Sequence, residues 1–405
     1  MSASPRTPGA SAGSQLAIDG GTPVRSTMLP YGRHWISASD VTAVVDALTS
    51  DFLTTGPRIA QFETAFATYV GAKHAVAFCN GTAALHAAAH AAGLGPESQV
   101  VTTPMTFVAT ANCARFVGAS VTFADVRPDT LTLDPAAVRR AVSGRGGAII
   151  TCDYAGEPSD LDELAAIAHD CGAVLIEDAC HALGARYRGR TIGSIAPLTV
   201  FSLHPVKHVT TGEGGVVTTN DQELAQRLRT FRTHGIEDRR GLAEVTWQYD
   251  MVELGYNYRI TDFQCALGTA QLAHADAWLT RRRTIADHYQ SAFAHVPQIE
   301  VPTALADRDH AWHLYVIRLR LDRIQSDRVR VFRALRAENV GVNVHYIPVP
   351  WHSYYQKLGY RRGEWPVAER AYEQMLSLPI FPAMTDADVD DVIDAVTKVV
   401  AYYAS

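Results

Sequence analysis

Lysine and long apolar runs are both scarce in this sequence. Of its 36 basic residues only four are lysines, so chemistry that requires a primary amine has few candidates. No apolar stretch approaches the roughly 20 residues that a membrane-spanning helix needs. The sequence therefore predicts no transmembrane segment.

Several other classes of protein are also disfavoured. The six cysteines form no C-x-x-C pair, which indicates neither a metal site nor a disulfide framework. A net charge of −6 offers no basic surface for nucleic acid. Residues 1–14 are rich in Ser, Ala, Pro and Gly without the apolar core of a secretory signal, which predicts a disordered leader and a cytoplasmic protein.

The chain alternates short β-branched runs with amphipathic segments from about residue 16 to residue 272, a pattern typical of α/β proteins. The runs are mostly too apolar for a half-exposed sheet, so helices should cover both faces. We expect a large α/β domain over residues 15–272 and a smaller C-terminal α+β domain over residues 273–405. The seven candidate strands of the mostly parallel sheet are residues 75–79, 99–102, 120–123, 148–152, 173–176, 198–201 and 215–218.

Capping signals and periodicity predict further elements. Ser159-Asp160 followed by Glu163 predicts a capping box that opens a helix through about His169, and Asn220-Asp221 predicts another that ends near Gly235. The run Arg281-Arg-Arg283 is expected on a solvated helix face. In the C-terminal part we expect strands over residues 313–319 and 341–345 and helices over 326–338 and 386–402.

One of the four lysines lies where a reactive amine is expected. Lys73 precedes a strand in a turn, and Lys357 and Lys398 are typical surface charges. Lys207 lies between a strand end and the glycine-rich turn of residues 210–215, where the backbone can approach a ligand closely. Lys207 is therefore the candidate for an imine with a carbonyl group.

Two carboxylates lie at the end of an apolar strand, in Glu177-Asp178. Open α/β sheets bind their ligands at this edge. A carboxylate there, together with an imine-forming lysine, is what pyridoxal phosphate requires, because it keeps the ring nitrogen protonated. Asp178 is the candidate; the alternative is that it caps a following helix.

A phosphate group would also need a cradle. The strand ending at Cys79 leads through Asn80-Gly81-Thr82 into an alanine-rich helix, so free backbone N–H groups and the Thr82 hydroxyl would face an anion. Ser202 can add a second hydroxyl. Phe107 follows another strand end and could offer an aromatic face, or be part of the core.

These segments resemble the DegT/DnrJ/EryC1/StrS aminotransferases, which are pyridoxal phosphate enzymes of fold type I that act mostly on nucleotide-linked keto sugars. The resemblance extends from about Leu29 to Tyr402 and includes eight segments in the expected order. They are Leu53-Thr-Thr-Gly-Pro57, Asn80-Gly-Thr-Ala-Ala-Leu85, Thr103-Pro-Met-Thr-Phe-Val-Ala-Thr-Ala-Asn112, Asp153-Tyr-Ala-Gly156, Glu177-Asp-Ala-Cys-His-Ala-Leu-Gly184, Phe201-Ser-Leu-His-Pro-Val-Lys207, Gly255-Tyr-Asn-Tyr-Arg-Ile-Thr-Asp262 and Val344-His-Tyr-Ile-Pro348.

The resemblance implies a role for each site residue. Lys207 would bond covalently to pyridoxal phosphate and move protons during catalysis, and Asp178 would bind the ring nitrogen. Asn257 would reach the phosphate of the neighbouring subunit, which makes the expected working unit a homodimer. The remaining cofactor residues would be Gly81, Thr82, Ala83 and Ser202 at the phosphate, Phe107 stacked on the ring and His181 beside the ring oxygen. The candidates for binding substrate, each of which could instead be structural, are Thr55, Tyr154, His204, His345 and Tyr346.

Within the family the sequence is most similar to the C4 transaminases that act on UDP-linked 4-keto-6-deoxy sugars in the pseudaminic acid pathway. This predicts L-glutamate as amino donor and a nucleotide-linked 4-amino sugar as product. Residues 16–25 instead resemble the leader of members that aminate cyclitols or serve antibiotic pathways, and Pro350-Trp-His352 departs from the sugar enzymes in a loop expected to touch substrate. Three alternatives are an aminocyclitol transaminase, a regulatory protein that binds the cofactor without turnover, and a dehydratase, which Lys207 disfavours because such members carry histidine there.

Overall fold

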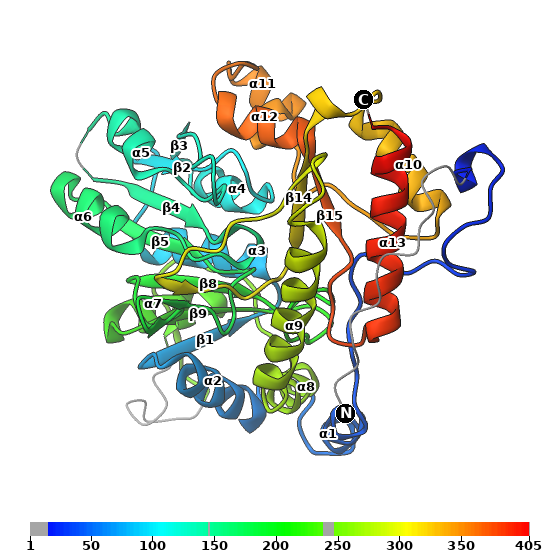
Figure 1. Cartoon of the computed structure of the whole chain (residues 1–405). Coiled ribbons are helices and arrows are strands. Elements are labelled where there is room, and N and C mark those ends of the chain that lie inside the picture. The colour runs from blue at the N-terminus through cyan, green and yellow to red at the C-terminus, as the bar shows by residue number, and fades with distance from the viewer. Residues whose placement is uncertain (1–14, 145, 238–246, 405) are drawn as a thin grey trace.

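The computed structural model describes residues 15–144, 146–237 and 247–404, and the predicted leader of residues 1–14 lies outside these ranges (Figure 1). A seven-stranded sheet with strand order β1-β9-β8-β5-β4-β2-β3 forms its centre. All neighbouring strands pair in parallel except those that flank β9, which runs against both β1 and β8. The strands are β1 (His74–Phe78), β2 (Gln99–Thr102), β3 (Ser120–Phe123), β4 (Ala148–Cys152), β5 (Val174–Asp178), β8 (Leu198–Ser202) and β9 (Gly215–Thr219).

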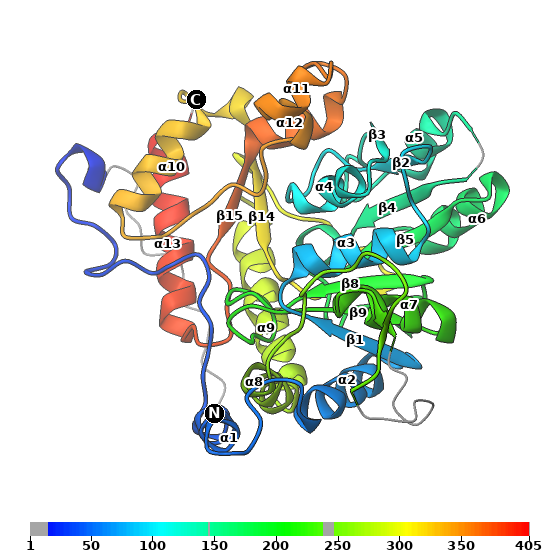
Figure 2. The ribbon, with the colours of Figure 1, turned by 180° about the vertical axis from the view of Figure 1, so that it is seen from behind.

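This sheet confirms the predicted mostly parallel α/β architecture, with strand ends displaced by at most two residues. The strands are apolar throughout because helices cover both faces, and every residue of β4 and β9 is buried. Figure 2 shows the reverse side of the molecule. One face packs against α3 (Gly81–Ala91), α4 (Ala109–Phe116) and α7 (Gln222–Arg232), and the other against α2 (Pro57–Val70), α5 (Pro135–Ala141), α6 (Leu161–Cys171) and α8 (Asp262–Leu272).

The C-terminal part forms a smaller layer beside this sheet (Figure 1). The long helix α9 (Ala275–Phe293) leads into a sheet with the order β12-β14-β15. Leu16 and Leu29 of the N-terminal segment pack into the same core as this sheet and α13. The predicted domain boundary after residue 272 falls between α8 and α9 and stays a prediction. The other elements of this layer are β12 (Ile299–Glu300), β14 (Tyr315–Leu319), α10 (Arg328–Ala337), α11 (Ser353–Lys357), α12 (Pro366–Gln374), β15 (Met375–Leu378) and α13 (Asp386–Tyr402).

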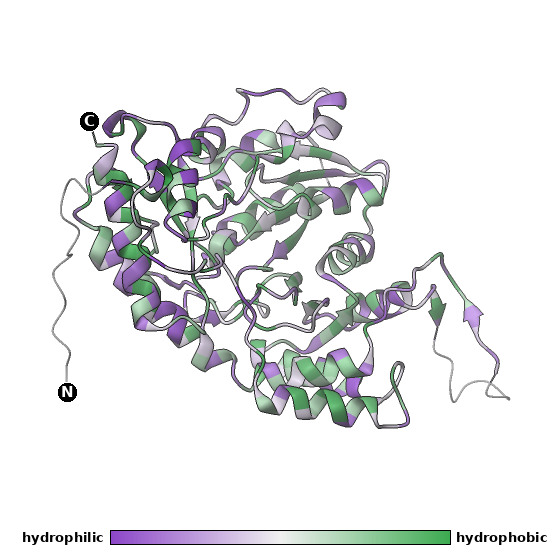
Figure 3. Cartoon of the chain, turned by 90° about the vertical axis from the view of Figure 1, so that its right-hand side faces the viewer, coloured by the Kyte–Doolittle hydropathy of each residue, from purple (hydrophilic) through white to green (hydrophobic). Residues whose placement is uncertain are grey.

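Short elements complete the chain. The sheet β13-β6-β7 lies beside the main sheet, and β10 pairs with β11 in a ribbon that projects from the body in Figure 3. No helix within the described ranges combines the length and apolar composition that crossing a membrane demands. These elements are η1 (Ala17–Asp19), α1 (Ala38–Leu48), η2 (Tyr154–Gly156), β6 (Arg186–Tyr187), β7 (Arg190–Thr191), β10 (Ile236–Glu237), β11 (Asp250–Met251), β13 (Arg308–Asp309), η3 (Leu321–Arg323) and η4 (Val349–Trp351).

Two local predictions are wrong. Residues 341–345 form no strand: only Asn343 pairs, with Ser377, before the chain turns toward the cavity described below. The capping box at Ser159 does not form, because Ser159 bonds to Asp153 and the Asp160 carboxylate binds two arginines instead of backbone N–H groups. In both cases contacts with residues far away in the sequence replace the hydrogen bonds that the local pattern predicts.

Of two cations expected at the surface, Arg282 is buried and Lys398 is largely buried. Arg282, the middle residue of the run predicted on a solvated face, is 2% exposed. The Lys398 side chain is 9% exposed and its amine forms an ion pair with the fully buried Glu338 at 2.9 Å. The same Glu338 accepts hydrogen bonds from the backbone of Ala17 and Val24. Lys398 therefore helps to hold the N-terminal segment, and Arg282 is considered further below.

Candidate active site

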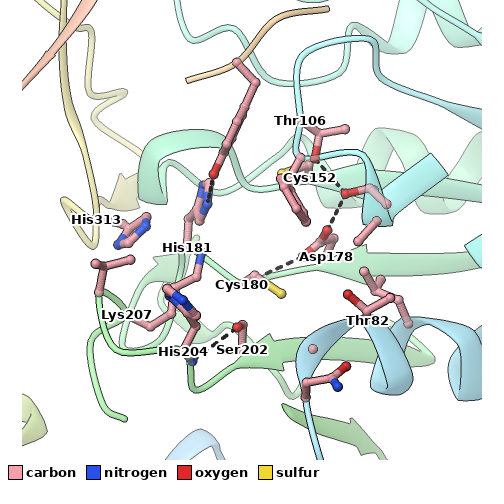
Figure 4. A pocket seen from close by; sticks show the side chains of 18 of the residues that line it. Thr82, Thr106, Cys152, Asp178, Cys180, His181, Ser202, His204, Lys207 and His313 are labelled. Carbon is pink, nitrogen blue, oxygen red and sulfur yellow. Dashed lines mark hydrogen bonds between the residues drawn. The ribbon is translucent and has the colours of Figure 1, made fainter. Parts of the chain in front are cut away.

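A cavity of about 650 Å³ lies at the carboxyl ends of β4, β5 and β8, beside the start of α3 (Figure 4). This is the edge at which open α/β sheets bind their ligands, and its size is typical of a small-molecule site. All but three of the predicted site residues line it. The lining residues predicted from the sequence are Gly81, Thr82, Ala83, Phe107, Asp178, His181, Ser202, His204, Lys207, His345 and Tyr346.

Lys207 faces this cavity from the loop that follows β8. The loop folds tightly, since Lys207 donates its backbone N–H to His204 and the glycine-rich turn returns to bond with Leu203. Lys207 and His313 both line the cavity. Burial lowers the pKa of its amine from the usual 10.5, so a larger fraction of the neutral, nucleophilic form is present near neutral pH.

Asp178 ends β5 and faces the cavity from the adjoining strand. Its Oδ2 accepts a hydrogen bond from Thr110 Oγ1 at 2.6 Å, and its Oδ1 accepts from the backbone of Cys180 at 3.2 Å. Thr110 is in turn bonded to Thr106 at 2.6 Å. No helix follows Asp178, because the chain continues in turns. The alternative role as a helix cap is therefore wrong, and the carboxylate is held in place for a ligand.

The start of α3 provides a site for an anion. Asn80 caps the helix by accepting from the backbone of Ala83 at 2.8 Å. The backbone N–H groups of Gly81 and Thr82 have no partner within the described part of the chain, so they are free to bind an anion. The Ser202 hydroxyl lies close, since a Cβ added to Gly81 would meet its oxygen at 3.2 Å. A side chain at position 81 would crowd Ser202 and narrow this anion site.

These three groups fit pyridoxal phosphate. Its phosphate matches the free N–H groups of α3 with Thr82 and Ser202, its ring nitrogen matches Asp178, and its carbonyl carbon matches the Lys207 amine. His181 strengthens the match, because its Nδ1 is buried and has no hydrogen-bond partner among the described residues. A buried polar atom without a partner is costly unless a ligand satisfies it.

Histidine and tyrosine side chains form another wall. The His181 ring lies 4.4 Å from that of His313, and its Nε2 is 3.1 Å from the Tyr346 hydroxyl. Burial holds the pKa of His181 and His313 well below 6.5 and lowers that of His345 to about 4. These three imidazoles are therefore neutral at physiological pH and can serve as hydrogen-bond donors and acceptors.

Thr55, Tyr154 and Asn257 do not line the cavity. Thr55 is exposed in the loop before α2, and Asn257 is exposed beside Thr233, to which it pairs. Tyr154 is buried behind the wall, where its hydroxyl donates to the His345 carbonyl. The roles predicted for these residues remain predictions, and Tyr154 supports the segment that carries His345.

Three further predicted positions differ in their exposure. Phe107 is 55% exposed, with its ring 6.0 Å from that of Tyr346, so it presents an open aromatic face at the cavity. His204 is exposed at the rim. Trp351 of the loop expected to touch substrate is absent from the described residues that line the cavity; its ring instead lies under Arg362 at 4.1 Å.

Sequence reasoning missed several residues that line the cavity. Thr110 could have been found, since it lies four residues after Thr106 in a segment already singled out; the structure places it in the first turn of α4. Tyr31 and His313 come from segments whose local pattern carries no such signal. Tyr31 reaches the cavity because the N-terminal segment packs along the C-terminal layer, and its ring lies 5.2 Å from His345.

Comparisons with known proteins agree with this geometry. A sequence model of the DegT/DnrJ/EryC1/StrS aminotransferase family matches residues 35–397. The chain is 41% identical over 381 residues to the spore coat polysaccharide biosynthesis protein SpsC of Bacillus subtilis, covering 93% of this chain and 98% of SpsC.

Solved structures also resemble the chain closely. PseC of Helicobacter pylori, an aminotransferase involved in the biosynthesis of pseudoaminic acid, has a TM-score of 0.87 at 29% identity, with 92% of this chain and 99% of that chain covered. The PLP-form of a putative sugar aminotransferase from Streptococcus pneumoniae has a TM-score of 0.87 at 28% identity, with coverage of 93% and 100%.

Proposed function

Because the chain belongs to the DegT/DnrJ/EryC1/StrS aminotransferase family, and is thus a pyridoxal phosphate-dependent aminotransferase of fold type I, we propose that it aminates a nucleotide-linked sugar. The proposed substrate is a 4-keto-6-deoxy sugar, the product is the 4-amino sugar, and the proposed amino donor is L-glutamate. The observation that carries the proposal is that Lys207, Asp178 and the free N–H groups of α3 share one cavity.

Lys207 is the proposed catalytic residue. Pyridoxal phosphate, when bound, supplies an electron-accepting ring that stabilises negative charge on the carbon that loses a proton. The Lys207 amine takes the proton from the donor's carbon, and in the second half of the reaction it delivers a proton to the former keto carbon. The lowered pKa of Lys207 favours the neutral amine that the first step needs.

Asp178 and His181 are proposed to orient the cofactor ring. An ionised carboxylate beside the ring nitrogen favours its protonated form, and the hydrogen bonds from Thr110 and Cys180 hold the two oxygens in position. His181 is kept neutral by burial and bonded to Tyr346, so it can share a hydrogen bond with the ring oxygen without adding a charge.

The substrate class is supported by the similarity to PseC and by the wall around His345 and Tyr346. PseC is an aminotransferase involved in the biosynthesis of pseudoaminic acid, and 92% of this chain is covered by the match to its structure. Neutral imidazole and phenol groups are well suited to hydrogen-bond sugar hydroxyls. His204 at the rim and Phe107 beside Tyr346 would contact the part of the substrate nearer the solvent.

An aminocyclitol transaminase is the second candidate. The N-terminal segment favours it: residues 16–25 resemble the leader of members that aminate cyclitols or serve antibiotic pathways, and the segment continues to Tyr31, which lines the cavity. A substrate without a nucleotide would need contacts only within the cavity. A sugar nucleotide also needs a surface beyond its rim.

We propose that the working unit is a homodimer in which Asn257 completes the partner's phosphate site. Asn257 lies outside the cavity of its own chain. Large apolar side chains are exposed in the segment that precedes it in the sequence, as expected for a surface that a second copy covers. They include Trp247, Tyr249, Met251, Val252, Leu254 and Tyr256.

A substrate panel tests the proposal. The purified enzyme with pyridoxal phosphate is offered UDP-linked and dTDP-linked 4-keto-6-deoxy sugars and a free cyclitol ketone, each with L-glutamate or L-glutamine. Amine products are detected by mass spectrometry. Amination of a sugar nucleotide with glutamate supports the proposal, whereas amination of the cyclitol ketone alone establishes the second candidate.

A spectroscopic control separates turnover from binding. Glutamate alone should abolish the visible absorbance of the cofactor bound to Lys207 as the amino group is transferred. If the cofactor binds but its spectrum does not respond to either donor, the protein is a cofactor-binding protein without transaminase activity.

A further inference from the structure

Arg282 on α9 is buried beside the active site, whereas its sequence neighbours Arg281 and Arg283 are partly exposed. Its side chain is 2% exposed, and its Nη1 donates to three backbone carbonyls. The acceptors are Ile380 at 2.9 Å, Trp312 at 3.1 Å and His313 at 3.3 Å. A single guanidinium therefore joins α9 to two segments that are far apart in the chain.

One of these segments, residues 311–314, forms part of the active-site wall. Its backbone bonds to η2 through Ala311 and Leu314, which donate to Gly156 and Ala155. The Ala311 carbonyl also accepts from Nε2 of His208, the residue that follows Lys207, at 2.9 Å. The segment thus lies between Arg282 on one side and the Lys207 loop on the other.

Arg282 carries a charge that no carboxylate neutralises within the described part of the chain, since none of the ion pairs there includes it. The neighbouring Arg281 differs: it is partly exposed and pairs with Asp386 at 2.7 Å. Burying a guanidinium without a counter-charge is costly. The hydrogen bonds of Arg282 to the three carbonyls offset part of this cost.

We propose that Arg282 is a positioning residue of this active site: its guanidinium holds the segment that carries His313 against Lys207 and places an unneutralised positive charge near both side chains. The inference rests on the proposed role of Lys207. It extends the machinery by a residue that contacts neither cofactor nor substrate.

The electrostatic effect of Arg282 has a definite direction. Its positive charge adds to burial in lowering the pKa of Lys207, and it also lowers the pKa of His208 and His313. Asp178, Cys152 and Cys180 act in the opposite direction on Lys207. The other titratable groups that line the cavity around the Lys207 amine are His181, His204, His345, Glu213, Tyr31, Tyr258 and Tyr346.

The test measures the proton affinity of Lys207 directly in the cofactor-free protein. Only four lysines are present, so lysine labelled with carbon-13 beside its amine gives few NMR signals, and Lys207→Arg identifies the one that belongs to Lys207. The chemical shift of that signal is recorded as a function of pH, and the midpoint of the titration is compared between the parent protein and the variants Arg282→Met, Arg282→Lys and Arg281→Met. Arg281→Met is the matched control, one residue away on the same helix.

Arg282→Met should raise the midpoint of Lys207 by about 0.5 to 1 pH unit, because a nearby buried positive charge is lost. Arg282→Lys keeps the charge and should leave the midpoint within about 0.3 unit of the parent. Arg281→Met should not change it. A pH titration of the cofactor-loaded enzyme, followed by its visible absorbance, should show a midpoint that moves in the same direction in Arg282→Met.

A folded Arg282→Met protein whose Lys207 titrates as in the parent would overturn the proposal. If both Arg282 variants fail to fold while Arg281→Met folds, Arg282 serves only the stability of the fold, and the proposal is likewise wrong. The titration needs no substrate, so its outcome is independent of whether the sugar nucleotide is the true substrate.

Discussion

Thr110 donates a hydrogen bond from its Oγ1 to Oδ2 of Asp178, with 2.6 Å between the two oxygens. The other oxygen of Asp178 accepts from the backbone of Cys180. Both carboxylate oxygens thus face donors from the protein, and the carboxylate suits this position better than an amide of the same shape. An asparagine would have to point its NH₂ group at one of the two donors.

Asp178→Asn should therefore lower kcat/KM at least tenfold to a hundredfold. The substitution removes a charge-assisted hydrogen bond to the cofactor ring, worth roughly 1.5–3 kcal/mol. Steady-state kinetics with glutamate measure the effect. Thr110→Val, which keeps the charge and removes one orienting bond, should cost less, about threefold to tenfold. Activity of Asp178→Asn within about threefold of the parent would mean that another group binds the ring nitrogen.

Lys207→Ala should abolish transamination and remove the covalent bond to the cofactor that borohydride reduces, while the fold stays intact. The loop around Lys207 is held by the Lys207 backbone N–H, which donates to His204, and by backbone bonds between Leu203 and the glycine-rich turn, so losing the side chain should not unfold it. Peptide mass spectrometry of the reduced parent enzyme locates the modified lysine. Finding the adduct on Lys73, Lys357 or Lys398 would refute the assignment.

Mixed dimers test the proposed contribution of Asn257. In a hybrid of Lys207→Ala and Asn257→Ala subunits, two-fold symmetry places both lesions in one site and leaves the other site intact. Each hybrid should recover up to about half of the parent activity per dimer by this symmetry argument. The hybrids are made by co-expression with two affinity tags.

The separate variants serve as controls for that measurement. Each should be inactive or nearly so on its own. Hybrids that are as inactive as the separate variants would show that both residues act within one chain.

Glu157 should make stability depend on pH. It is buried, and among the described residues only its Oε1 has a hydrogen-bond partner, the backbone of Leu305 at 3.0 Å. Burial raises its pKa from 4.5 to about 8, although Arg308 lies near. The folded state therefore binds the proton more tightly than the unfolded chain, so this group's contribution is fully present below about pH 4.5 and is lost as pH rises through about 8.

Glu157→Gln should remove this dependence. The fall in Tm between pH 5 and pH 8 should shrink by several degrees, because a neutral amide does not titrate. Thermal unfolding followed by circular dichroism across this range measures it. Glu163→Gln, an exposed position on α6, is the control and should leave the pH dependence of the parent. The prediction fails if Glu157→Gln shows the same fall in Tm as the parent.

Sequence reasoning located the strands and most of the cavity because both depend on local signals. An apolar β-branched run followed by a small or polar residue indicates a buried parallel strand and its carboxyl end. Asp178 ends such a strand, Lys207 and Thr82 follow the ends of two others, and the fold brings these ends to one edge. The residues that it missed, such as His313 and Tyr31, enter the cavity from segments packed against that edge from outside the sheet.

Composition and strand pattern thus determined the architecture, and the shortage of lysine and the strand ends predicted the reactive amine and the anion site. The tertiary structure alone decided where the remaining charges lie. Arg282 lies between two partly exposed arginines and Lys398 follows a partly exposed threonine, yet carbonyls and Glu338 from distant segments bind their cationic groups. Helical periodicity carries no information about such partners, since only the packing of α9 and α13 against the rest of the chain brings them into contact.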